Sequence, residues 1–162
     1  MSNIVAGIGR GQLKVLDQRI AKKKYIFEYY KQSLSDSDGI RFMPINDWNE
    51  PNYWLSCITL DGNIKPLDII LALEDENIES RPIWKPMHMQ SFYEQYQFIG
   101  EGISRQIFEN GVCLPSDTKM SDEDLKRIIK VIRGLWVSGV PLSLQQASQR
   151  IPQSNHEKRF ET

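Results

Sequence analysis

The apolar residues of the first 34 positions recur at helical spacing, and most of them fall on one stripe. They are Ile4, Val5, Ile8, Leu16, Ile20, Phe27, Tyr30 and Leu34. This period predicts one long helix over residues 2–34, which Ser2 or Asn3 can cap. Glycines within residues 7–11 each cost about 1 kcal/mol relative to alanine in a helix. They therefore indicate either the close approach of another backbone or an irregular turn.

The middle of the chain changes to short apolar runs separated by turn residues. Polar and glycine-containing positions 35–39 end the first helix by turn chemistry. The expected elements that follow are a strand at 40–43, a strand at 53–60, a helix at 66–76 and a strand at 78–84. The run at 53–60 is the best strand, because it is apolar and β-branched.

A second group of short elements follows residue 90. Short helices are expected at 92–96 and 103–109, the latter ending at Asn110 and Gly111, and a brief strand at 112–115. Asparagine followed by glycine is a favourable pair for the carboxyl end of a helix.

The last regular element is the clearest. Ser121 can cap a helix whose first turn holds three acidic residues, which a helix N-terminus favours. Its apolar stripe is Leu125, Ile128, Ile129, Ile132, Leu135 and Trp136. Beyond it, residues 137–162 are rich in glutamine and serine and are expected to form a disordered tail. A weak amphipathic helix at 142–151 is the alternative.

Together these elements predict an α/β fold of the α+β kind. Residues 1–136 form one domain, in which a long N-terminal helix precedes a small, mostly antiparallel sheet with helices packed on one face. Long crossover helices between all strands are lacking, which argues against a parallel sheet.

Composition narrows the class of protein. The chain has a formal net charge of -1 and a sequence pI of about 6.1, which gives no overall attraction to nucleic acid. We expect no secretory signal, and no run reaches the ~18 apolar residues of a membrane span. Cys57 and Cys113 are isolated in sequence, so we expect free thiols in a reducing cytoplasm.

Residues 80–88 (SRPIWKPMH) hold the strongest candidate for ligand contact. Two prolines stiffen the segment, so a strand is expected to continue into a rigid loop. Arg81, Lys85 and His88 on that loop suit an anionic ligand. The alternative is an ordinary surface loop with Trp84 buried in the core.

Other chemistry finds little support in the sequence. His88 and His156 are the only histidines, which leaves no serine–histidine–aspartate set, and no zinc-like spacing or phosphate-binding loop occurs. The glycines at 7–11 match a dinucleotide motif only weakly. Residues 22–24 (KKK) are interpreted as a solvated helix face rather than a nucleic-acid patch.

Three segments in order resemble the DegT/DnrJ/StrS family of pyridoxal-phosphate-dependent sugar aminotransferases. They are residues 1–13 (MSNIVAGIGRGQL), 81–90 (RPIWKPMHMQ) and 111–116 (GVCLPS), the last followed by 120–125 (MSDEDL). The second segment is most similar to transaminases of UDP-linked 4-keto-6-deoxy-N-acetylhexosamines, as in bacillosamine synthesis. The resemblance covers residues 1–135 and implies the C-terminal small domain of the type I aminotransferase fold.

The resemblance also implies what this stretch does not carry. In the family, the lysine that forms the imine with the cofactor and most phosphate contacts lie upstream of the matched helix. An Asn-Tyr-Arg segment that contacts the neighbouring subunit's cofactor would directly precede Met1. We therefore expect the chain to be inactive alone, with pyridoxal phosphate and glutamate as family implications. Arg81, Lys85 and His88 would line the nucleotide-sugar side of the site.

Three hypotheses follow. The chain is part of a sugar aminotransferase whose cofactor domain is supplied by another chain. Alternatively it is a non-catalytic remnant or interaction domain, with a dimer contact through Ile4, Val5 and Ile8. The third hypothesis is a nucleotide-sugar-binding module without chemistry.

Overall fold

The computed structural model describes residues 2–138. Of the tail expected at 137–162, the structure describes only Val137 and Ser138, which complete the last helix. The alternative helix at 142–151 lies outside the described residues. The boundary expected after residue 136 therefore stays a prediction.

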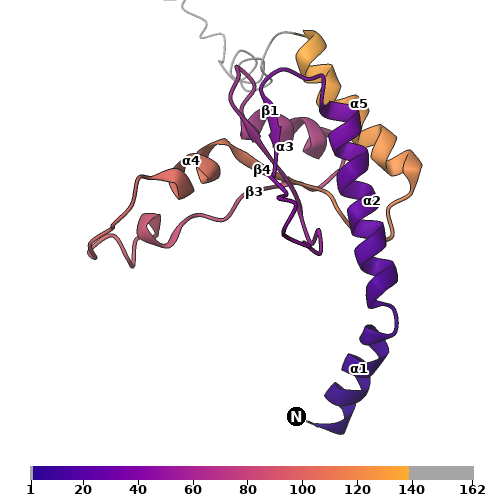
Figure 1. Ribbon diagram of the computed structural model, residues 1–162. Helices are drawn as coiled ribbons and strands as arrows, with labels where there is room; N and C mark the ends of the chain where they lie inside the picture. Colours follow the sequence, from indigo (N-terminus) through magenta and orange to yellow (C-terminus); the bar gives the residue numbers. More distant parts are fainter. Residues whose placement is uncertain (1, 139–162) are drawn as a thin grey trace, which may run out of the picture.

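The predicted N-terminal helix is divided in two. α1 spans Asn3–Leu13 and α2 spans Leu16–Leu34. Between them the Val15 amide donates to the carbonyl of Gln12, three residues earlier (3.2 Å), instead of to the carbonyl four residues earlier as in an α-helix. Val15 also has non-helical backbone angles. α1 buries no residue and extends away from the rest of the molecule (Figure 1), so no packing holds it in line with α2. The capping prediction is confirmed, because Ser2 Oγ accepts from the Val5 amide.

The sheet has four strands in the order β1-β2-β4-β3, and every neighbouring pair is antiparallel. The strands are β1 Ile40–Phe42, β2 Ser56–Leu60, β3 Arg81–Pro82 and β4 Gly111–Leu114. This confirms the small antiparallel sheet. β2 begins later than expected because Tyr53 has a φ of 51°, outside the strand region. β3 is shorter than expected, since Pro82 cannot donate to the ladder.

Four further helices complete the fold. They are α3 Pro66–Asp75, the short 3-10 helix η1 Met87–Met89, α4 Ile103–Asn110 and α5 Asp122–Ser138. The helix expected at 92–96 is instead a series of turns. Gly111 does not cap α4 in a left-handed conformation, because it is extended and begins β4. Among residues 2–138, no helix is both long and apolar enough to cross a membrane.

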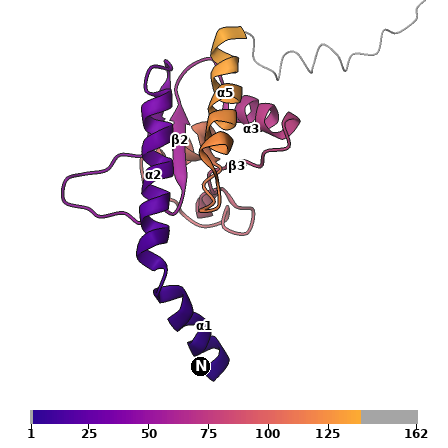
Figure 2. The ribbon, with the colours of Figure 1, turned by 90° about the vertical axis from the view of Figure 1, so that its right-hand side faces the viewer.

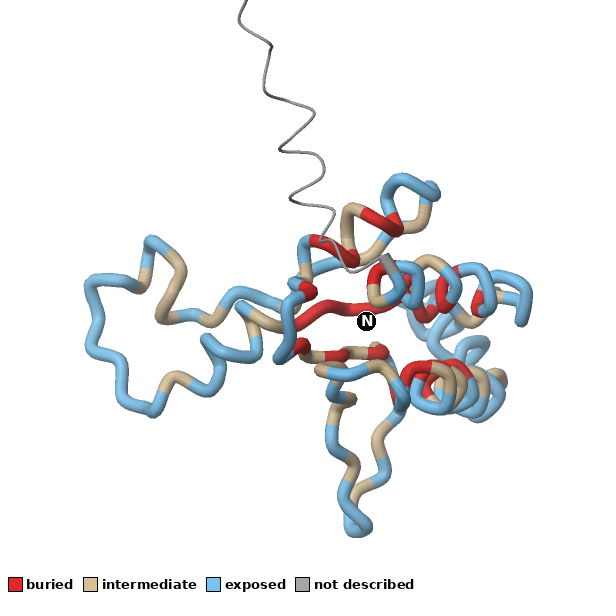
Figure 3. The backbone as a smooth tube through the Cα atoms, turned by 90° about the horizontal axis from the view of Figure 1, so that it is seen from above, coloured by how far each residue is buried: buried red, intermediate tan, exposed pale blue. Residues whose placement is uncertain are grey.

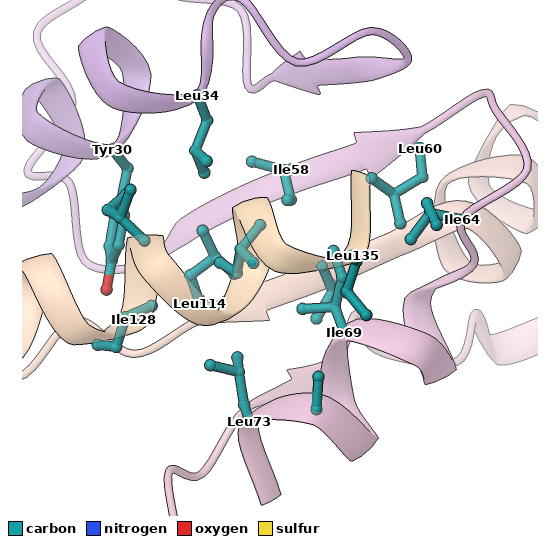
Figure 4. Close-up of a cluster of buried hydrophobic side chains, with 14 of the residues drawn as sticks. Tyr30, Leu34, Ile58, Leu60, Ile64, Ile69, Leu73, Leu114, Ile128 and Leu135 are labelled. Carbon is teal, nitrogen blue, oxygen red and sulfur yellow. The ribbon is translucent and has the colours of Figure 1, made fainter. Parts of the chain in front are cut away.

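One face of the sheet carries the core. Side chains of α2, α3 and α5 meet those of β2 and β4 in a single buried cluster, which includes Tyr30, Ile58, Leu73, Leu114 and Ile132. Figure 4 shows this packing, and Figure 3 shows the buried residues gathered at the centre of the molecule. α2, α3 and α5 therefore confirm the prediction of helices packed on one face of the sheet. Burial along β2 alternates, which turns Cys57 and Thr59 to the opposite face.

Two long segments leave the sheet. The segment between β1 and β2 extends to the side in Figure 2, and the segment between β3 and α4 extends away in Figure 1. Both are largely exposed. They return to the sheet beside one another, where Trp54 contacts Trp84.

Candidate functional site

A pocket of about 630 Å³ lies where β3 and β4 meet the segment that leads into β2. Two of the three predicted ligand-binding residues, Arg81 and Lys85, line this pocket. Its other chemically distinctive lining residues are Lys23, Trp54, Trp84, Cys113 and Ser116, together with the carboxylates of Glu79 and Asp117. The pocket is open to solvent, and Cys57, the register partner of its lining residue Cys113, lies on the sheet face opposite the apolar core.

Two tryptophans form an aromatic wall of the pocket. The ring centroids of Trp54 and Trp84 are 6.4 Å apart with planes at 34°. Both indoles are about two-thirds exposed, at 66% and 64%. The alternative that buries Trp84 in the core is therefore wrong. Exposed indoles at this spacing offer a surface on which a flat ring can stack.

The cations of the pocket differ in their partners. The Arg81 guanidinium donates to the Glu79 carboxylate (Nε to Oε1, 2.7 Å), which neutralises part of its charge. Lys85 is exposed on the loop between β3 and η1. Lys85 is therefore the freer of the two positive charges for an anionic ligand.

His88 does not join this pair. It lies in η1 and stacks on Phe98, with ring centroids 3.8 Å apart and planes at 23°. Its Nε2 atom is buried and has no hydrogen-bond partner within the described residues. The structure thus separates His88 from the pocket of Arg81 and Lys85.

Lys23 belongs to the pocket, although its sequence context suggested a solvated face. Its Nζ donates to the Trp54 carbonyl (2.9 Å) and lies 3.4 Å from Ser116 Oγ. Burial lowers the pKa of Lys23, and the nearby Asp117 carboxylate opposes that shift. Helical spacing could have revealed this position from the sequence, since Lys23 precedes the buried Phe27 by one turn and Tyr30 by two and therefore lies on the same face of α2.

The two cysteines are partners in space. Cys57 on β2 pairs with Cys113 on β4, and their sulfur atoms are 3.5 Å apart. The thiol contact lowers the pKa of Cys113, because the Cys57 S–H can donate to its thiolate. The same contact raises the pKa of Cys57, and burial adds to this rise.

The described residues do not form a complete site for pyridoxal phosphate. That cofactor needs a lysine free to form an imine. Lys23 donates its protons to protein acceptors, and Lys85 is exposed on the loop after β3. No group of three histidine, cysteine or acidic side chains within residues 2–138 is placed to hold a metal.

Solved structures share this fold. An aminotransferase TlmJ from Streptoalloteichus hindustanus matches with a TM-score of 0.74 at 24% identity, over 83% of this chain and 36% of its own. DesI, solved in the presence of its TDP-sugar product, matches with a TM-score of 0.81 at 18% identity, over 91% of this chain and 38% of its own. The fold is therefore that of one part of a type I aminotransferase.

The chain belongs to the DegT/DnrJ/EryC1/StrS aminotransferase family, whose sequence profile matches residues 1–133. The resemblance inferred from the ordered motifs is thereby confirmed. EpsN of Bacillus subtilis (strain 168), provisionally named a pyridoxal phosphate-dependent aminotransferase, is 41% identical over 140 residues, which are 84% of this chain and 36% of EpsN. The GDP-perosamine synthase of Vibrio cholerae is 30% identical over 144 residues, 84% of this chain and 38% of the synthase. The chain spans little more than a third of the length of these relatives.

Proposed function

We propose that this chain contributes the substrate-facing small domain of a pyridoxal-phosphate-dependent aminotransferase that transfers an amino group from glutamate to a nucleotide sugar. A UDP-linked 4-keto-6-deoxy sugar is the proposed substrate, used in cytoplasmic steps of glycan or polysaccharide synthesis. The observation that carries the proposal is the pocket in which Trp54 and Trp84 stand beside Lys85 and Arg81.

The chemistry of the pocket matches the two halves of such a ligand. A uracil ring has a flat face for an indole, and a diphosphate carries the negative charge that Lys85 and Arg81 complement. His88, with its unpaired Nε2 beside Phe98, is proposed as a separate polar contact on the sugar or cofactor side. The aminotransferase family match over residues 1–133 and the aminotransferase name of EpsN, at 41% identity, support this assignment.

Transamination is proposed only for this chain together with residues that supply the imine-forming lysine. These come from a cofactor domain of the same family, on the same or a separate polypeptide. The first test is the visible absorption of residues 1–162 with pyridoxal phosphate, alone and co-expressed with the upstream part of EpsN. A borohydride-sensitive band is expected only in the co-expressed sample. A specific band in residues 1–162 alone, lost in Lys23→Met or Lys85→Met, would contradict the proposal.

The nucleotide-sugar part is tested by calorimetry with UDP-N-acetylglucosamine. Replacing Lys85 by methionine should weaken binding by roughly 10- to 100-fold, since a hydrogen bond to a charged group contributes about 1.5–3 kcal/mol. The matched control is Lys126→Met on the exposed face of α5. Equal affinity in the wild type and the Lys85 variant would remove the pocket from the proposal.

The second candidate function is a non-catalytic interaction domain. The observation that favours it is α1, which buries none of its residues and exposes Ile4, Val5 and Ile8. A dimer through α1 would satisfy this surface. No absorption band in either sample, together with a stable dimer of the chain, would favour this function over the enzyme.

A further inference from the structure

Cys57 and Cys113 already occupy the positions that a disulfide requires. They are register partners on the antiparallel strands β2 and β4. Opposed residues on such strands have Cα atoms about 4.5–5.5 Å apart. Disulfides span Cα separations of about 4.4–6.8 Å. With the sulfur atoms 3.5 Å apart, rotation of the two side chains brings them to bonding distance without moving the strands.

The surroundings of the pair favour a thiolate and give a reagent access to it. Cys113 lines the 630 Å³ pocket and is 7% exposed, and Cys57 beside it is half-buried. On the other side of Cys113 its register partner is Arg81 of β3. The Arg81 guanidinium is engaged by Glu79, so the group that can stabilise a Cys113 thiolate is the Cys57 thiol, whose sulfur is 3.5 Å away. The open pocket gives an external disulfide access to the pair. This combination distinguishes the pair from two thiols buried in an apolar core.

We propose that Cys57 and Cys113 are a reversible dithiol–disulfide site for low-molecular-weight disulfides such as oxidised glutathione. The thiolate of one cysteine attacks a glutathione sulfur, forms a mixed disulfide and releases one reduced glutathione. The sulfur of the other cysteine then attacks the protein sulfur of that mixed disulfide. The Cys57–Cys113 bond forms and the second glutathione leaves. The pair loses two electrons and two protons, and oxidised glutathione is reduced to two thiols.

The bond would act directly on the pocket wall. Cys57 lies three residues after Trp54, and Cys113 lies three residues before Ser116. Lys23 already bridges Trp54 and Ser116 at that end of the strands. Oxidation therefore adds a covalent link between β2 and β4, next to the residues preceding β2 and following β4 that Lys23 joins by hydrogen bonds. The oxidised chain should melt roughly 5–10 °C higher than the reduced chain.

The test is incubation of the 162-residue chain with oxidised glutathione under native conditions, followed by intact mass and peptide mapping. The expected product has lost two hydrogen atoms, carries no glutathione, joins the β2 and β4 peptides, and reverts with dithiothreitol. Wild-type chain that stays reduced, carries two glutathiones, or forms only intermolecular disulfides would overturn the proposal.

Single variants give the matched control. In Cys57→Ser and Cys113→Ser the remaining cysteine should keep one glutathione, because its resolving partner is gone. Cys57→Ala and Cys113→Ala repeat the measurement without a buried hydroxyl, and circular dichroism verifies their fold. Release of glutathione from a folded single variant at the wild-type rate would also contradict the proposal.

Discussion

Three consecutive lysines of α2 have different surroundings, and their positions on the helix explain why. Lys22 places its ammonium 4.8 Å from the Tyr25 ring centroid, and Lys24 is exposed. Lys23 shares the face of Phe27 and Tyr30, so its side chain reaches the pocket instead of bulk water. Three consecutive lysines look alike in the sequence unless the position of each around the helix is taken into account.

Replacing Lys23 by methionine should destabilise the chain by about 1–2 kcal/mol, because the Trp54 carbonyl and Ser116 lose a charged donor. The bond between Ser116 Oγ and the Trp54 carbonyl (3.4 Å) compensates only in part. Urea unfolding measures the effect. Lys24→Met is the control and should stay within about 0.5 kcal/mol of the wild type. Equal losses in both variants would place Lys23 on the solvated face.

The candidate site was predictable in part at this scale. Arg81 and Lys85 share one short segment, and two prolines limit how far they can separate, so their convergence on one pocket followed from the sequence. His88 was placed with them because it is near in sequence. Its position depends on stacking with Phe98, ten residues later across irregular turns, and no local pattern encodes that contact.

The helices and strands differ in how far local sequence decides them. α5 begins where its capping residues predicted, since Ser121 and Asp124 bond each other's backbone amides. The predicted strand at 78–84 is shorter in the structure because Pro82 cannot donate to the ladder, and the predicted helix at 92–96 is a series of turns whose residues are mostly exposed. Propensity without packing does not hold a strand or helix in place.

The cap of α5 should make the free energy of unfolding depend on pH in the acid range. Hydrogen bonds from the Ser121 amide and hydroxyl lower the pKa of Asp124. A carboxyl with a depressed pKa stabilises the fold above its unfolded-state pKa of about 4, and the stabilisation is lost as the pH falls through the folded value. Urea unfolding between pH 7 and pH 3 should show a steeper acid loss in the wild type than in Asp124→Asn. Glu123→Gln, which removes none of these bonds, should follow the wild type.

The contact of α4 with β4 depends on the absence of a side chain at Gly111. A Cβ there would lie 2.3 Å from Ile83 Cδ1 and 2.4 Å from the Ile107 carbonyl. The backbone of Gly111 is ordinary extended chain, so the effect of Gly111→Ala is steric and should cost about 1–3 kcal/mol. Gly62→Ala, where a Cβ meets open space, is the matched control. Thermal unfolding that ranks Gly62→Ala below Gly111→Ala would refute this packing.

The whole molecule combines a well-packed body with an unpaired N-terminal helix. The fold class could be predicted from the sequence because the apolar residues of 16–34, 56–60 and 122–136 recur with a helix or strand period. Each of these elements buries its apolar face in the same cluster. The break between α1 and α2 did not, because it reflects a missing packing partner rather than a breaking residue. A stripe of apolar residues predicts a helix without saying what covers it.

The exposed apolar residues of α1 should make the isolated chain associate. Ile4, Val5 and Ile8 are 77%, 54% and 61% exposed, on a helix that none of residues 2–138 buries. Light scattering during size exclusion should show mass rising with concentration. Replacing these three residues by serine should reduce the association, whereas Val137→Ser, at a still more exposed site on α5 (89%), should not. A monodisperse, cooperatively melting wild-type monomer would contradict this expectation.

The strand order also determines how long β2 lacks its second neighbouring strand while the chain is being synthesised. β2 pairs early with β1, yet its other neighbour, β4, lies 56 residues further along at the paired cysteines. At about 5–20 residues per second, a ribosome needs roughly 3–11 s to supply β4 after β2 has emerged. Through that interval one edge of the best strand in the protein has open amides and carbonyls. Synthesis on neighbouring ribosomes would therefore be the stage at which two copies are most prone to pair wrongly.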